Sequence, residues 1–269
     1  MHPRPRIIRA PDLVQRGVSR RRREFYLRDG SLRRLRRGAY LAAVDLPPGV
    51  DAAERELVLG THAAAADLRP GTVISHVSAL ALHGLPIHAL DTQRVTTTRH
   101  RPGSGTRRTS SSVRYSADLA GAVVEIDGIP TTSVARSIVD VARSGRFTGA
   151  LCAADGALHL EMCTRSDLER EAEAARGKRG VEVARGVVAF ADGRAESVLE
   201  SVSRLTIHRL GLPMPEPQVE LRLGSSRTVY PDLFWEEWKL VGECDGLGKY
   251  GIEDGVPNAR NALAAEKER

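Results

Sequence analysis

The sequence predicts a multi-domain α/β protein of the α+β kind, and three observations lead to this fold class. Its first 45 residues contain two short helical segments followed by a basic strand pair. Its middle part mixes helical periodicity with short runs rich in threonine and valine. The last part begins with an amphipathic helix and continues as three strands. At 269 residues the chain is long enough for separate compact units.

The N-terminal segment, expected to span residues 1–45, has local signals for every element. APDLVQRG predicts a short helix ended by Gly17, and Ser19 is placed to cap a second helix that ends at Gly30. SLRRLRRGAYLAAV alternates apolar and basic residues around Gly38, as two paired strands do. Helix, glycine turn, helix and hairpin is the order of a winged helix-turn-helix.

This segment also concentrates positive charge. Residues 1–40 hold thirteen arginines and three acids, so 13 − 3 = +10, whereas the whole chain carries only +6. If Phe25 points into the core, Arg20 and Arg23 fall on the outer face of the second helix. Double-stranded DNA is therefore the expected partner, since phosphates bind such arginine clusters. The predicted contacts are Arg20, Arg21, Arg22 and Arg23 on the helix, and Arg33, Arg34, Arg36 and Arg37 on the wing.

The middle domain is expected over residues 46–190, after the LPPGV boundary. Strands are predicted at residues 94–100 and 112–119 around a flexible loop, and Asp127-Gly128 predicts a hairpin turn. Ser133 is placed to cap a helix over VARSIVDVAR. In SHVSALALHGLP, His76 and its serines are interpreted as capping and packing residues, because no orienting acid stands at a suggestive spacing.

SRRRREFYLRDGSLRRLRRGAYL, SHVSALALHGLP and IPTTSVARSIVDVAR together resemble the AbiEi-type antitoxins of bacterial type IV toxin–antitoxin systems. The resemblance covers roughly residues 10–145. It implies an N-terminal winged helix-turn-helix, a second α/β domain and a role in transcription regulation through promoter DNA. A cognate toxin and a second copy of the chain are the other candidate partners.

YPDLFWEEWKLVGECDGLGKYG, in the domain expected over residues 191–269, places carboxylates around one hairpin. A turn at Glu236–Glu237 would pair Trp235 with Trp238 and set Asp232 opposite Val241. Glu243 would then be the diagonal neighbour of Asp232, and Asp245 would share a face with Glu243. Grouped carboxylates repel one another unless a cation neutralises them, and Mg²⁺ prefers oxygen ligands. The helix before the strands offers a further carboxylate, either Glu200 or Glu196.

Helix and three strands with these acids resemble the PD-(D/E)XK nuclease superfamily, and more closely its Vsr-like endonuclease-related domains. The matching residues are Pro231-Asp232 and Glu243-Cys244-Asp245, with Glu200 in the helix and Gln218 before the first strand. The resemblance implies a metal, Mg²⁺ or Mn²⁺, held by Asp232, Glu243 and Glu200, and hydrolysis of a phosphodiester bond. Asp245 replaces the usual lysine, which leaves Lys249 to supply the positive charge. Relatives continue to a closing strand, so this nuclease core is expected to be incomplete at its C-terminus.

The composition excludes some classes of protein. Cys152, Cys163 and Cys244 form no CxxC pair, which argues against a disulfide framework or a cysteine-ligated zinc. No apolar run has the length of a membrane span, and the N-terminus lacks the apolar core of a secretory signal, so a cytoplasmic protein without a membrane partner is expected. Two functions remain open: a DNA-binding regulator with a nuclease-like C-terminal domain, and an active Mg²⁺-dependent DNA endonuclease.

Overall fold

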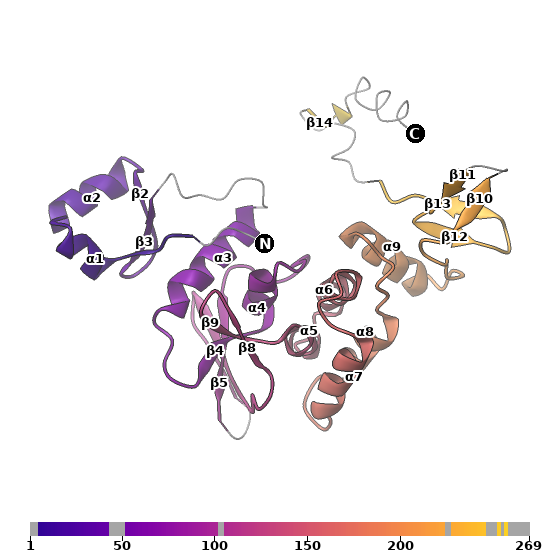
Figure 1. Ribbon diagram of the computed structural model, residues 1–269, viewed down its shortest axis with the longest axis horizontal. Coiled ribbons are helices and arrows are strands. Elements are labelled where there is room, and N and C mark those ends of the chain that lie inside the picture. The colour runs from indigo at the N-terminus through magenta and orange to yellow at the C-terminus, as the bar shows by residue number, and fades with distance from the viewer. Residues whose placement is uncertain are drawn as a thin grey trace. The chain divides into compact units, whose positions relative to one another are not determined.

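The computed structural model describes residues 5–42, 52–101, 105–223 and 227–245, and the backbone of two short strands, β14 (Ile252–Glu253) and β15 (Val256–Pro257). The chain divides into two compact units, residues 1–191 and 192–269. The expected domain boundary near residue 46 and the predicted catalytic residue Lys249 lie outside the described residues. Figure 1 shows the order of the elements along the chain.

The N-terminal module, residues 5–42, consists of two short helices and a small sheet around its own core. Leu13, Leu32 and Tyr40 are buried at its centre, and Tyr26 and Leu27 pack against them. Its sheet is antiparallel in the order β1-β3-β2. The elements are β1 (Ile8–Arg9), α1 (Ala10–Gln15), α2 (Arg20–Arg28), β2 (Leu32–Arg36) and β3 (Ala39–Ala42).

The second helix, α2, begins where the sequence predicts. The Ser19 side chain accepts a hydrogen bond from the backbone N–H of Arg22 at 3.2 Å, which satisfies one free donor of the first turn. The expected inward direction of Phe25, however, is wrong, because this side chain is 59% exposed. Tyr26 and Leu27 take the core positions instead, and this rotation of the helix brings Arg23 over the Tyr40 ring, 5.7 Å from its centroid.

The middle of the chain contains a six-stranded mixed sheet in the order β6-β7-β5-β4-β9-β8. Its strands are β4 (Thr72–Ile74), β5 (Val95–His100), β6 (Gly105–Arg108), β7 (Ser112–Ala117), β8 (Val123–Ile126) and β9 (Ile129–Thr132). The predicted Asp127-Gly128 turn is confirmed: both residues have positive φ, 51° and 78°, as a two-residue hairpin requires. The loop expected between residues 100 and 112 is wrong in part, since it contains β6.

Helices accompany this sheet. Ile74, Ala79 and Ile129 form a buried cluster between the sheet and the helices that contact it, α3 and α4. The following helices pack against one another beside the sheet (Figure 1). The helices of this region are α3 (Ala52–Ala65), α4 (His76–His83), α5 (Val134–Arg143), α6 (Phe147–His159), α7 (Arg165–Ala174) and α8 (Val181–Phe190). Ser133 caps α5 as predicted, accepting from the Arg136 backbone N–H at 3.3 Å.

The second unit consists of one helix and two strand pairs among its described residues before position 246. These are α9 (Val198–Arg209), β10 (Leu221–Leu223) with β11 (Arg227–Val229), and β12 (Leu233–Trp235) with β13 (Leu240–Gly242). The indole N–H of Trp235 donates to the carbonyl oxygen of Pro213 at 2.7 Å, tying β12 to the segment after α9.

The predicted pairing of the β12–β13 hairpin is wrong. Trp235 pairs with Leu240 rather than Trp238, and Leu233 pairs with Gly242, so the Asp232–Val241 pairing does not form. The two strands are joined by four residues, 236–239, with Lys239 at φ 49°. A two-residue turn would need positive φ at one or both glutamates, which suits glycine or asparagine, so the longer loop is the less strained solution.

Candidate nucleic-acid interface and carboxylate cluster

The predicted DNA-binding arginines occupy three kinds of environment on the N-terminal module. Some form ion pairs: Arg20 lies 3.0 Å from Glu24, Arg33 pairs with Glu56, and Arg36 lies 3.7 Å from Asp67. Others contact rings: the Arg22 Nε donates to the Tyr26 hydroxyl at 2.8 Å, and Arg23 lies over Tyr40. Arg21, Arg34 and Arg37 are exposed, and their side chains have no hydrogen bond or ion pair with another described residue.

The three arginines without partners define the candidate interface. Arg21 is in the first turn of α2, Arg34 is in β2, and Arg37 is in the β2–β3 turn. Each carries a full positive charge that no nearby acid neutralises. The ion pairs of Arg20 and Arg33 are also exposed, and such surface pairs contribute about 1 kcal/mol or less. A phosphate can therefore replace the acid at small cost.

A second candidate site is a carboxylate cluster in the C-terminal unit, consisting of Glu200, Gln218 and Asp232. The Gln218 side-chain amide bridges the two acids: its Nε2 lies 3.3 Å from the Glu200 Oε2 and 3.2 Å from the Asp232 Oδ1. Backbone bonds set this geometry, since residue 216 pairs with Phe234 and the Gln218 N–H donates to the Pro231 carbonyl oxygen. Gln218 holds a left-handed φ of 55°, a conformation that costs a non-glycine residue energy.

The same two carboxylates receive backbone N–H groups as well. The Asp232 Oδ2 accepts from the Cys244 N–H at 2.6 Å, and the Glu200 Oε2 accepts from the Glu196 N–H at 3.0 Å. Glu200 is only 4% exposed, so these bonds compensate a carboxylate that is largely removed from water. Sequence reasoning placed Gln218 next to the first strand but did not identify it as the bridge, because only tertiary folding brings it between the acids.

The remaining predicted nuclease residues lie beyond the end of β13. Glu243 is exposed and Asp245 is half-buried. Across the part of the chain that the structure describes, no three histidine, cysteine, aspartate or glutamate side chains stand close enough to hold a metal ion together. Within the described residues, neutral N–H donors therefore hold the two carboxylates in place. Binding of Mg²⁺ or Mn²⁺ by Asp232, Glu243 and Glu200 stays a prediction.

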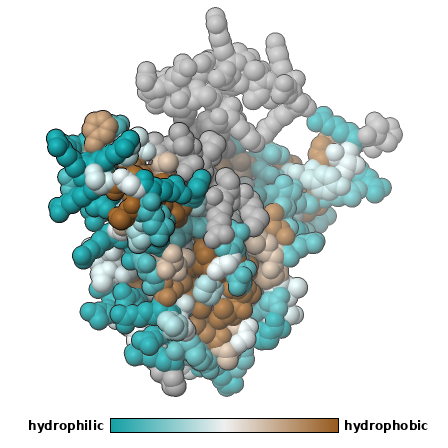
Figure 2. Space-filling view, turned by 60° about the vertical axis from the view of Figure 1, so that its left-hand side comes forward, coloured by the Kyte–Doolittle hydropathy of each residue, from teal (hydrophilic) through white to brown (hydrophobic). Residues whose placement is uncertain are grey.

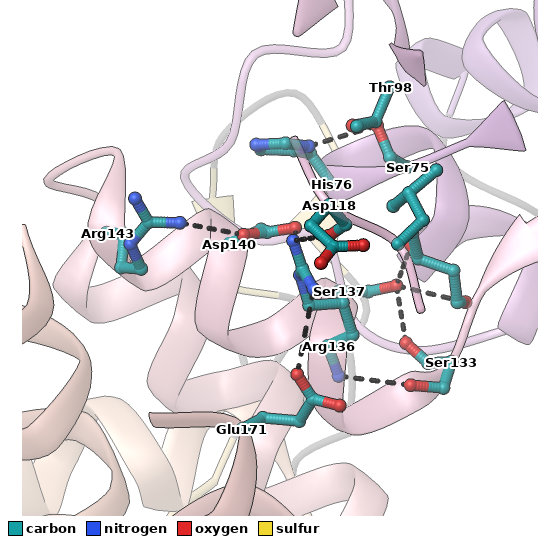
Figure 3. A network of polar contacts seen from close by, with 12 residues as sticks. Ser75, His76, Thr98, Asp118, Ser133, Arg136, Ser137, Asp140, Arg143 and Glu171 are labelled. Carbon is teal, nitrogen blue, oxygen red and sulfur yellow. Dashed lines mark hydrogen bonds and ion pairs between the residues drawn. The ribbon is translucent and has the colours of Figure 1, made fainter. Parts of the chain in front are cut away.

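A buried polar network lies in the first compact unit, around α5 (Figure 3). The Asp140 carboxylate on α5 is 3% exposed and accepts from the Arg136 Nε at 2.8 Å and from the Arg143 Nη1 at 3.0 Å. Arg136 also donates to the Asp118 carbonyl oxygen at 3.2 Å and lies 3.9 Å from Glu171 of α7. This network links α5 to α7 and to the loop before β8.

His76 and Ser75 belong to the same region. The His76 ring stacks on Tyr115 with centroids 3.7 Å apart, and its Nδ1 lies 3.0 Å from the Ser75 Oγ. Burial lowers the pKa of His76 to about 4, more than the Asp140 charge raises it, so the ring is neutral at pH 7. The Ser75 Oγ is fully buried and accepts a hydrogen bond from Thr98 at 2.8 Å. The pair is sealed from solvent, which supports a packing role rather than nucleophilic chemistry.

The face of the molecule in Figure 2 is largely hydrophilic, and hydrophobic residues emerge on it in patches. One apolar groove, with a volume of about 740 Å³, lies between the α3–β4 connection and the β8–β9 hairpin. Its titratable lining residues are Arg69 and His100. Within the described residues no helix is long and apolar enough to cross a membrane.

Known proteins match parts of this chain. Residues 72–188 match the family described as the AbiEi antitoxin C-terminal domain. Two uncharacterized proteins from Mycobacterium tuberculosis, MT2308 (strain CDC 1551) and Rv2248 (strain H37Rv), are each 37% identical over 122 residues, which is 45% of this chain and 45% of the relative. The chain thus matches less than half the length of these curated relatives.

Among solved structures, the RV2827C protein from Mycobacterium tuberculosis is similar with a TM-score of 0.43 and 17% identity, covering 69% of this chain and 72% of that chain. The AbiEi likeness predicted from the sequence is confirmed for residues 72–188. The Vsr-like resemblance of the C-terminal unit stays a prediction.

Proposed function

We propose that this chain is a DNA-binding transcriptional regulator related to AbiEi antitoxins, and that residues 5–42 are its DNA-binding module, a winged helix-turn-helix. The observation that carries the proposal is the group of exposed arginines on α2 and its adjoining hairpin whose side chains have no partner among the described residues, Arg21, Arg34 and Arg37. The AbiEi match of residues 72–188 supports a role connected with a toxin–antitoxin system. A cognate toxin and a second copy of the chain are further proposed partners.

Phosphate contacts should dominate the affinity of this module. Unpaired arginines on two adjoining elements can follow a DNA backbone, and each phosphate neutralised releases counterions. The ion-paired arginines, Arg20 and Arg33, can join when a phosphate displaces their acid. Such contacts position the protein but carry little sequence information.

The test is a salt titration of DNA binding by fluorescence anisotropy. Replacing Arg21, Arg34 and Arg37 by alanine should weaken binding about tenfold or more and reduce the slope of log K against log salt by up to about 3. The matched control removes the same charge from exposed arginines that pair with acids elsewhere, Arg170, Arg176 and Arg222, and should bind like the parent protein. Equal slopes for the two triple variants would remove the module from the interface.

A second candidate is a Mg²⁺-dependent DNA endonuclease, and the meeting of Glu200 with Asp232 through Gln218 favours it. The test incubates supercoiled plasmid with the protein, with Mg²⁺, with Mn²⁺ or with EDTA. Nicking that requires metal and is lost in Asp232→Ala would establish the activity. If the protein shifts DNA in a gel but does not nick it, the role of the cluster is structural.

A further inference from the structure

Phe25 is an aromatic residue that does not pack into the core of the N-terminal module. Its side chain is 59% exposed, although the next two residues of α2, Tyr26 and Leu27, pack against the module's core. Its ring meets the edge of the Tyr26 ring, with centroids 6.0 Å apart and an interplanar angle of 61°. Among the large hydrophobic side chains of residues 5–42, Phe25 and Val14 are the exposed ones. Covering an exposed aromatic ring with a partner lowers the free energy, so such a ring favours a binding surface.

Within α2, the residues three and four positions from Phe25 are Arg21, Arg22 and Arg28, and the C-cap Asp29 accepts hydrogen bonds from Ser31. Residues three and four apart share a helix face, so Arg21 and Arg28 flank the ring on either side. Arg21 has no partner among the described residues, and the Arg28 Nε lies 3.4 Å from the Glu24 carbonyl oxygen. The face therefore presents an apolar ring between two positive charges.

This charge pattern selects the kind of partner. A second copy of the chain would bring the same arginines against themselves across a symmetric contact and repel. A DNA groove presents negative phosphates on both sides of the base edges, which matches cations on both sides of a ring. On those edges the main apolar feature is the C5-methyl group of thymine, in the major groove, which is wide enough to admit a helix.

Building on the proposed DNA-binding function, we propose that Phe25 is a specificity-determining residue that contacts the C5-methyl group of a thymine in the major groove. Arg21 and Arg28 hold the flanking phosphates, and Phe25 distinguishes thymine from the other bases through apolar contact. The arginines thus give affinity for any duplex, and the ring gives preference for particular sequences.

The test compares thymine with uracil, which differs from it only by lacking that methyl group. A duplex enriched by the full-length protein from a random pool is synthesised with each thymine replaced in turn, and affinities are measured by fluorescence anisotropy. Loss of the contacted methyl group should weaken binding about fourfold, equivalent to about 0.8 kcal/mol, at one position of each bound site. Phe25→Ala should bind the thymine and uracil probes equally.

Two further variants make the result specific to the ring. Phe25→Leu keeps an apolar side chain and should retain part of the thymine preference. Val14→Ala removes the other exposed hydrophobic side chain of the module and should retain all of it. Equal binding of every uracil probe by the parent protein, or an unchanged preference in Phe25→Ala, would overturn the proposal. Failure of the parent protein to bind any duplex would instead overturn the DNA-binding function itself.

Discussion

Gly180 lies where the start of α8 meets the end of α5, and replacing it by alanine should destabilise the protein strongly. Gly180 precedes α8 with φ +79°. An added Cβ would lie 2.0 Å from the carbonyl oxygen of Arg143 and 2.9 Å from its Cα, well inside contact distance. Those atoms are backbone at the end of α5, so one helix has to move.

The magnitude follows from two separate costs. A left-handed conformation costs a non-glycine residue about 1–2 kcal/mol, and forcing atoms into a packed site costs about 1–3 kcal/mol more. Gly180→Ala should therefore lower the free energy of unfolding by about 2–5 kcal/mol. Gly177 has a similar φ, +73°, but an added Cβ there meets nothing within 4 Å. Gly177→Ala should show only the first cost, about 1–2 kcal/mol.

The assay is urea unfolding followed by circular dichroism at 222 nm, with the two variants and the parent measured side by side. Unchanged m-values would show that the variants expose the same surface area on unfolding. Differences between their urea midpoints then report differences in stability. Equal losses of stability in Gly177→Ala and Gly180→Ala would refute the reasoning, because the contact with Arg143 would then cost nothing.

Two more predictions concern the buried network of the middle domain. Burial lowers the pKa of His76 from 6.5 to about 4, so the unfolded chain binds a proton at this ring more tightly than the folded chain does. The stability that neutral His76 contributes is therefore complete above pH 6.5. It falls by about 3 kcal/mol as the pH decreases toward 4. In His76→Asn, asparagine tolerates the left-handed φ of 51° at this position. Urea unfolding of this variant should show a smaller loss of stability between pH 6.5 and pH 4 than the parent protein shows. An identical loss would contradict the assignment. Asp140→Ala should cost about 3–5 kcal/mol in the same assay, since it removes the buried carboxylate that Arg136 and Arg143 share and leaves Arg136 with the more distant Glu171. Glu173→Ala, at exposed pairs with Arg176 and Arg185, should leave the stability nearly unchanged, and similar losses for the two acids would refute the role of Asp140.

Local signals in the sequence predicted local structure well. Ser19 and Ser133 were identified as helix caps, and Asp127-Gly128 as a hairpin turn, because each depends on the conformation of a few consecutive residues. The AbiEi likeness was also readable, because its motifs extend over the middle domain.

Features that depend on contacts between distant residues were missed. The rotation of α2 could not be determined from its own residues, because Phe25, Tyr26 and Leu27 are all apolar and only the shape of the core selects among them. Likewise, β7 pairs with both β5 and β6, the first parallel and the second antiparallel, and alternation along a strand does not identify its neighbours.

The candidate site shows the same limit. Asp232 and Glu200 were identified as chemically notable, yet their bridge through Gln218 depends on a bend of the chain that left-handed geometry at Gln218 permits. A four-residue loop sets the register of β12 with β13, and the two consecutive glutamates in the sequence do not indicate that loop length.

The β12–β13 hairpin has an optical consequence, since it carries both tryptophans of the chain. Trp235 is anchored by its bond to Pro213, and Trp238, in the connecting loop, is 50% exposed. Indole emission responds to the immediate surroundings of the ring, so the intrinsic fluorescence of this protein reports on the unit that contains the carboxylate cluster. Quenching of that emission by Mn²⁺ would locate the ion near the hairpin. Binding at the arginines of residues 5–42 is better followed through a label on the DNA.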